Sequence, residues 1–191
     1  MSSTNQQYDQ AVLTCRDLFL KKARDYGTSW RVLRIISIAD QLFIKAQRIR
    51  TLQQKAAQRV EQRVGDDRTA EFIAMVNYGI IGLIQLSFNG DGGRNPMEDL
   101  PVEEVEALYD EKMALARETM LNKNHDYGEA WREMSQESFA DLILMKLLRV
   151  RQILANEGRT LISEGIDSNF IDIINYSLFA LILIGEGKHR G

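Results

Sequence analysis

Two stretches of this chain are near copies of each other, and the duplication limits the folds open to it. Residues 22–31 read KARDYGTSWR and residues 123–132 read KNHDYGEAWR, at an offset of 101 (123 − 22). Identical residues recur at that offset from position 8 to position 50, and the Asn-Tyr pair at 77–78 recurs at 175–176. Self-similarity at a fixed offset is the sequence signature of a structural repeat. We therefore predict a tandem duplication whose two halves share one core.

The composition is that of an ordinary soluble globular protein and argues against several partners. Hydrophobic residues make up 45% of the chain and charged residues 27%, and the net charge is −3. Binding to duplex nucleic acid normally needs a basic patch, so we expect no such partner. The apolar runs near 72–88 and 173–184 are interrupted or too short for a membrane span of roughly 20 residues. A single cysteine and a polar start without a signal-peptide core lead us to expect a cytoplasmic protein with no membrane partner.

Helical patterns dominate both halves, and the two prolines lie between them. In the first half we expect helices at about residues 6–24, 37–64 and 68–88, with a short helical turn around Trp30. In the second half we expect helices at about residues 102–122 and 138–156, and a last one that follows Asp167-Ser168 and ends near Leu183. These helices predict an all-α fold.

A stretch rich in Gly, Asp and Pro separates the halves. The predicted units are a first helical repeat at 1–90, a linker at 91–104 and a second helical repeat at 105–191. We expect the repeats to pack as a pseudo-dimer, a helical bundle with an approximate twofold axis.

The long second helix of each repeat carries ionisable residues on a face that the apolar pattern leaves open. In the second repeat, apolar residues surround Asp141, Lys146 and Arg149 almost completely, and charges in such a helix must be paired or must face a cleft or ligand. Two interpretations stay open: a cleft for a polyanion, or a structural network in which Lys45 and Arg48 pair with Asp25 and Asp126. In addition, Ser37-x-x-Asp40 and Ser138-x-x-Asp141 match the capping box that starts a helix.

Aromatic and amide residues of the repeat also allow two interpretations. Trp30 and Trp131 are either wedges in a packed corner or platforms for a nucleotide base, because every base offers a π face. Asn77 and Asn175 lie in apolar helices, where a buried amide needs partners. They either hydrogen-bond each other across the twofold axis or reach a ligand.

The second repeat is richer in acids, which favours it as a metal site. Asp172 falls opposite Ala74, and Glu71 falls opposite Asn169. Magnesium prefers several oxygen ligands. If a divalent metal binds, Asp172 is expected to hold it together with carboxylates from the group Asp126, Glu137 and Asp141.

The phrase Lys-x-x-Asp-Tyr-Gly-x-x-Trp, followed by Asp-x4-Lys-x-x-Arg and a helix with Asn-Tyr, resembles the DUF1599 family, also called nucleotide modification associated domain 1. The resemblance covers roughly 8–88 and 109–186. That family is similar in style to all-α NTP pyrophosphohydrolases of the MazG and dimeric dUTPase type. Those enzymes hold magnesium with Glu-x-x-Glu and Glu-x-x-Asp pairs and release pyrophosphate. Here Glu71-x-x-Ala74 and Asn169-x-x-Asp172 each keep half of the second pair.

These features and the resemblance lead us to expect a protein that binds a small-molecule nucleotide, with magnesium-dependent hydrolysis of a nucleoside triphosphate as its enzymatic form. The expected catalytic residues are Asp126, Asp141 and Asp172, with magnesium on Asp141, Asp172 and Glu137. The expected nucleotide-binding residues of the second repeat are Lys123, Trp131, Arg132, Lys146, Arg149 and Asn175. A second, degenerate site would comprise Lys22, Asp25, Trp30, Asp40, Lys45 and Arg48. The alternative is a non-catalytic interaction module built on a buried charge network, and assembly into a homo-oligomer stays open.

Overall fold

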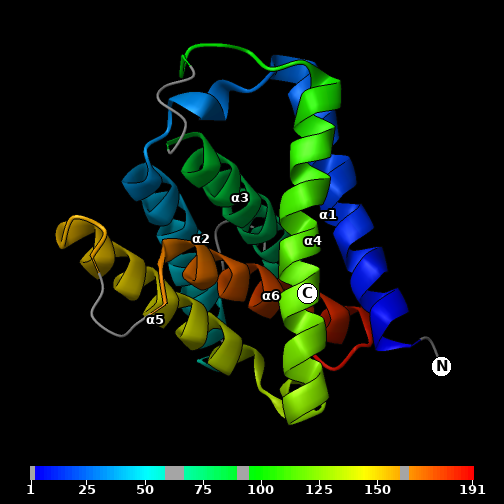
Figure 1. The fold of residues 1–191 in the computed structure, drawn as a ribbon. Coiled ribbons are helices and arrows are strands. Elements are labelled where there is room, and N and C mark those ends of the chain that lie inside the picture. The colour runs from blue at the N-terminus through cyan, green and yellow to red at the C-terminus, as the bar shows by residue number, and fades with distance from the viewer. Residues whose placement is uncertain (1–2, 59–66, 90–94, 160–163) are drawn as a thin grey trace.

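The computed structural model describes residues 3–58, 67–89, 95–159 and 164–191, and the predicted all-α fold is confirmed for them (Figure 1). Each half has a long helix, a short 3-10 turn and two further helices. The first half contains α1 (Thr4–Tyr26), η1 (Ser29–Val32), α2 (Ile35–Ala57) and α3 (Arg68–Asn89). The second half contains α4 (Val102–Tyr127), η2 (Ala130–Glu133), α5 (Gln136–Ala155) and α6 (Ile166–Gly185).

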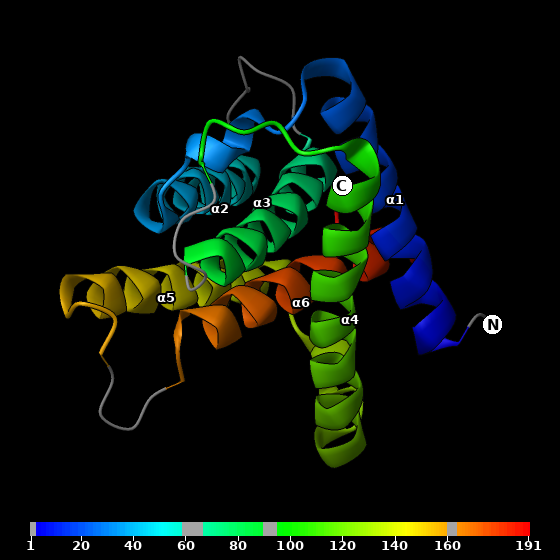
Figure 2. The ribbon, with the colours of Figure 1, turned by 45° about the horizontal axis from the view of Figure 1, so that its top comes forward.

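The helices form three layers (Figures 1 and 2). The apolar helices α3 and α6 cross in the middle, α2 and α5 cover one side of them, and α1 and α4 cover the other. Gly82 allows the close approach of the middle pair, because a Cβ there would lie 2.7 Å from the Phe170 ring. Buried residues of both repeats join in one hydrophobic core. The halves are therefore not separate folding units.

Helices α3 and α6 would be long and apolar enough to cross a membrane by composition alone. In this fold they are core helices, since 61% of the apolar window of α3 and 67% of that of α6 is buried.

Two buried tyrosine–asparagine pairs join the repeats reciprocally. The Tyr8 hydroxyl donates to Asn175 Oδ1 at 2.8 Å, and the Tyr109 hydroxyl donates to Asn77 Oδ1 at 3.0 Å. Each asparagine Nδ2 donates to a main-chain carbonyl of its own repeat at 3.0 Å. Burial raises the pKa of both tyrosines, so the phenols stay protonated donors. One interpretation was that the two asparagines hydrogen-bond each other, and this is not observed. Asn175, a predicted nucleotide-binding residue, uses both its side-chain oxygen and its side-chain nitrogen in hydrogen bonds within the fold.

Ion pairs repeat the same reciprocal pattern at the surface. The pairs are Arg16 with Asp110 (2.7 Å), Arg117 with Asp9 (2.8 Å), Arg151 with Asp40 (2.7 Å) and Arg50 with Asp141 (3.7 Å). When residue i meets residue j of the other copy, and j meets i, the interface has twofold symmetry. Exposed pairs contribute at most about 1 kcal/mol each. They nevertheless explain why charged residues recur at these four positions of each repeat, because each charge contacts the other repeat.

The capping-box interpretation of Asp40 and Asp141 is wrong. Helix α2 begins at Ile35 and α5 begins at Gln136, so both aspartates lie in the second turn. The side chain that caps α5 is Ser135, which accepts a hydrogen bond from the Ser138 main-chain nitrogen. Asp40 and Asp141 reach across to the other repeat instead.

Both first helices run further than predicted, through the Asp-Tyr of the repeated phrase. They end where Gly27 and Gly128 adopt positive φ angles of 67° and 63°, a conformation that glycine takes at little cost. The predicted end of α2 at Val64 and part of the predicted linker lie outside the described residues.

Candidate functional site

Each repeat forms a pocket where the end of its first helix meets its last helix. The first-repeat pocket has a volume of about 510 Å³ and the second-repeat pocket about 230 Å³. Corresponding side chains of the repeated phrase line both: Lys22, Tyr26 and Trp30 in the first, and Lys123, Tyr127 and Trp131 in the second. The lysine, tyrosine and tryptophan of the repeated phrase thus lie around two equivalent pockets.

A buried carboxylate lies between two cations at the first-repeat pocket. Glu71 Oε1 accepts from Arg48 Nη1 at 2.5 Å, and Glu71 Oε2 lies 3.2 Å from Lys45 Nζ. The second contact is an ion pair without hydrogen-bond geometry, which leaves the buried Oε2 atom with no hydrogen-bond donor among the described residues. Lys22 also lines this pocket, is exposed, and forms no ion pair with any residue that the structure describes. One cation and one carboxylate oxygen are thus available to a ligand.

The second-repeat pocket has a fully satisfied carboxylate. Asp172 Oδ1 accepts from Lys123 at 2.6 Å, and Asp172 Oδ2 lies 2.6 Å from Lys146. Burial lowers the pKa of Lys123, but its hydrogen bond to Asp172 and the nearby negative charge, chiefly that of Asp172, together outweigh burial and raise the pKa. Arg149 is exposed and forms no ion pair within the described part of the chain. Both lysines predicted to bind phosphate are therefore occupied by Asp172.

The two tryptophans differ in their surroundings. Trp131 is 6% exposed and stacks face to face on Phe179, with ring centroids 4.3 Å apart and planes at 5°. Trp30 is half-buried and meets Phe19 at 6.3 Å and 40°, beside the larger pocket. At the offset of 98 (175 − 77) that relates α3 to α6, Phe179 corresponds to Ile81. The smaller side chain leaves the first-repeat pocket open.

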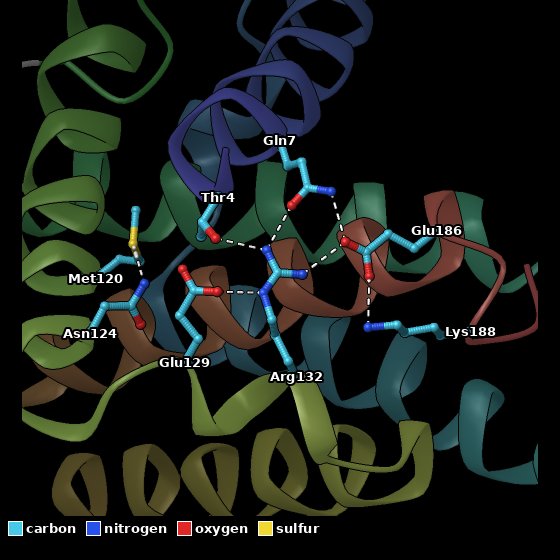
Figure 3. Close-up of polar contacts among 8 residues, drawn as sticks. All are labelled: Thr4, Gln7, Met120, Asn124, Glu129, Arg132, Glu186 and Lys188. Atoms are coloured by element: carbon cyan, nitrogen blue, oxygen red, sulfur yellow. Dashed lines mark hydrogen bonds and ion pairs between the residues drawn. The ribbon is translucent and has the colours of Figure 1, made fainter. Parts of the chain in front are cut away.

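Arg132, a predicted nucleotide-binding residue, forms hydrogen bonds with other side chains of the fold instead (Figure 3). Its guanidinium donates to Glu129 (2.5 Å), Glu186 (2.8 Å), Thr4 (2.7 Å) and Gln7 (2.7 Å). These contacts tie η2 to the start of α1 and the end of α6. Each of the three guanidinium nitrogens, Nε, Nη1 and Nη2, therefore donates at least one hydrogen bond within the fold.

The Arg132 cluster predicts a stability that falls in acid. Hydrogen bonds from Gln7, Lys188 and Arg132 lower the pKa of Glu186 below its ordinary 4.5. Burial raises the pKa of Glu129, but hydrogen bonds from Thr4 and Arg132 outweigh it and lower that pKa as well. A carboxylate whose pKa is lower in the folded than in the unfolded state stabilises the fold at pH values above its unfolded-state pKa. This stability is lost as the pH falls through the folded-state pKa.

We therefore expect the free energy of unfolding to drop as the pH is lowered from about 5 toward 3, and Arg132→Gln to flatten this dependence. Urea denaturation at several pH values measures both slopes. Equal slopes for the two proteins would contradict the assignment, and Arg159→Gln, which removes an exposed arginine, is the control.

The predicted magnesium ligands are not brought together. Asp126 is exposed beside His125, Asp141 pairs with Arg50, Glu137 is exposed in the first turn of α5, and Asp172 lies between two lysines. In residues 3–58, 67–89, 95–159 and 164–191, no group of three or more His, Cys, Asp or Glu side chains could hold a metal ion. The donor set therefore does not fit a magnesium site.

Two other assignments change with the structure. The cations Lys45 and Arg48 pair with Glu71, not with Asp25, which is exposed and does not line the pocket. The sequence did contain a signal for this, because Glu71 and Asp172 each lack an acid at the corresponding position of the other repeat. Each repeat thus supplies one acid to cations of its own, Glu71 to Lys45 and Arg48, and Asp172 to Lys123 and Lys146. In the repeat alignment the two acids lie about one helical turn apart.

The model of the family described as nucleotide modification associated domain 1 (DUF1599) matches residues 22–86 and again residues 123–184. The chain belongs to this family. Each match begins at the lysine of the repeated phrase and continues into the last helix of its repeat, so it contains the lysine, tyrosine and tryptophan that line the pocket. No curated protein and no solved structure matches the chain in the same comparisons.

Proposed function

We propose that this DUF1599 protein binds a nucleotide in a pocket lined by the repeated phrase, with the phosphate on the lysine of that pocket and the base on its tryptophan. The observation that carries the proposal is the presence of a lysine and a tryptophan of the repeated phrase in each of two equivalent pockets. Ammonium groups form charge-assisted hydrogen bonds with phosphate, and aromatic rings stack on bases. The family description, which refers to nucleotide modification, supports the same ligand class.

We assign no hydrolytic step to the pockets. A magnesium-dependent reaction on phosphates needs carboxylates that converge on the metal. Glu71 and Asp172 are instead compensated by basic side chains, and the other acids lie apart. Binding is therefore the function that the geometry supports best.

The second candidate is a structural role for the repeated charges. It is favoured for the reciprocal pairs such as Arg16 with Asp110 and Arg151 with Asp40, which join the repeats. It does not account for Lys22, which is exposed and forms no ion pair with the described residues.

A thermal-shift screen tests the proposal. The purified protein is heated with nucleoside mono-, di- and triphosphates, each with and without magnesium. A ligand at 100 times its dissociation constant adds about 2.7 kcal/mol to the stability of the folded state, which such a screen detects. We expect a shift with at least one nucleotide and without magnesium. The absence of a shift with every nucleotide would contradict the proposal and favour the structural role.

A further inference from the structure

The two pockets are equivalent in origin but not in their present state. We infer that only the first-repeat pocket binds ligand, one per chain, and that the ligand is a nucleoside monophosphate. This inference rests on the proposed function, because it names the working copy and the ligand class of the same site.

Size separates the two pockets. Pockets for small molecules usually measure about 300–1,000 Å³. The first-repeat pocket, at about 510 Å³, lies in this range, whereas the second, at about 230 Å³, lies below it. A single mononucleotide is the kind of ligand that the larger pocket accommodates.

The side chain that closes the second-repeat pocket is Phe179. It stacks on Trp131 at 4.3 Å and so covers the ring on which a base would lie. The corresponding Ile81 lines the first-repeat pocket without a ring to stack on Trp30. In the second repeat, Phe179 thus occupies the face of Trp131 on which a nucleotide base would stack.

The polar groups show the same asymmetry. In the second-repeat pocket, both oxygens of Asp172 are bound by lysines, so Lys123 already has an anion at 2.6 Å. In the first-repeat pocket, Lys22 has no such anion among the described residues, and Glu71 Oε2 lacks a hydrogen-bond donor there. A ligand with one anionic group and one hydroxyl or amino donor satisfies both.

The charge that lines the first-repeat pocket is closer to what a single phosphate needs than to what a triphosphate needs. Lys22 and Lys45 line the pocket with two positive charges and Glu71 with one negative charge, which leaves +1 (2 − 1). A phosphate monoester carries about −1.5 to −2 at pH 7. A triphosphate would bring roughly twice that charge, which these residues do not balance.

Isothermal titration calorimetry with dAMP, dCMP, dGMP and dTMP, each titrated alone into the full chain, tests the inference. We expect at least one to bind with a stoichiometry of one per chain, and the matching di- and triphosphates to bind no more tightly. A stoichiometry of two would overturn the inference, and so would a triphosphate that binds ten times more tightly than its monophosphate.

Matched variants locate the binding. Lys22→Gln should weaken affinity at least tenfold, because a charge-assisted contact to phosphate is lost. Its neighbour Lys21 is exposed and pairs only with Asp17 at 3.8 Å among the described residues, so Lys21→Gln should leave affinity unchanged. Ile81→Phe should abolish binding by copying the closed pocket, with thermal melting to verify that the variant folds. Lys123→Gln should have no effect on affinity.

The outcomes separate the inference from the proposed function. A loss of binding with Lys123→Gln and not with Lys22→Gln would place the ligand in the second repeat and overturn the inference while nucleotide binding stands. If the unmodified protein binds no mono-, di- or triphosphate, the proposed function itself fails, and the inference falls with it.

Discussion

Replacing Asp172 with alanine is expected to lower the free energy of unfolding by about 3–5 kcal/mol, because it leaves a buried cation without its partner. The side chain of Asp172 is 6% exposed and that of Lys146 is 9% exposed, so Lys146 would lose its anion in a place that water scarcely reaches. Urea denaturation at pH 7 measures the loss. Asp126→Ala removes an exposed carboxylate of the same repeat and should change stability by less than about 0.5 kcal/mol.

A second variant tests the reason for this loss. Adding Lys146→Met to Asp172→Ala removes both buried charges, and replacing a buried ion pair by apolar groups is often close to neutral. The double variant should therefore recover most of the stability. A loss below about 1 kcal/mol for Asp172→Ala, or no recovery in the double variant, would contradict a buried pair.

The double variant Tyr8→Phe/Tyr109→Phe should lose about 2–6 kcal/mol in stability. Each change leaves the buried side-chain oxygen of Asn175 or Asn77 without its tyrosine donor, and an unsatisfied buried group costs about 1–3 kcal/mol. Guanidinium denaturation measures the single and double variants, and near-equal single losses are expected from the twofold relation. Tyr127→Phe is the control, since Tyr127 is 78% exposed. Single losses that match this control would show that the two hydrogen bonds do not hold the repeats together.

The duplication and the all-helical fold were predictable from the sequence because they depend on local pattern and on the offset between copies. The partners of the repeated charges were not. Periodicity places Asp40 on a face of its helix, but only the packing of the two repeats brings Arg151 against it. For the same reason, the sequence left open whether Asn77 meets another asparagine, a ligand or, as observed, Tyr109.

The relative openness of the two pockets was the least predictable feature. The sequence pointed to the second repeat because it holds more acids, yet Asp172 neutralises the two lysines beside that pocket. Ile81 and Phe179 both read as ordinary core residues in an apolar helix. Their difference matters only because each lies next to the tryptophan of its repeat, which is a matter of tertiary packing.

The most direct test of nucleotide binding beside Trp30 uses the fluorescence of the two tryptophans of the chain. In Trp131→Phe, Trp30 is the only tryptophan that remains, and this change strips no hydrogen bond from Trp131 Nε1, which has no partner among the described residues. We predict that titration with the deoxynucleoside monophosphates quenches Trp30 emission saturably, because a base that stacks on the ring contacts it directly. In Trp30→Phe the emission of Trp131 should stay constant. A saturable change from Trp131, or none from Trp30, would contradict the account.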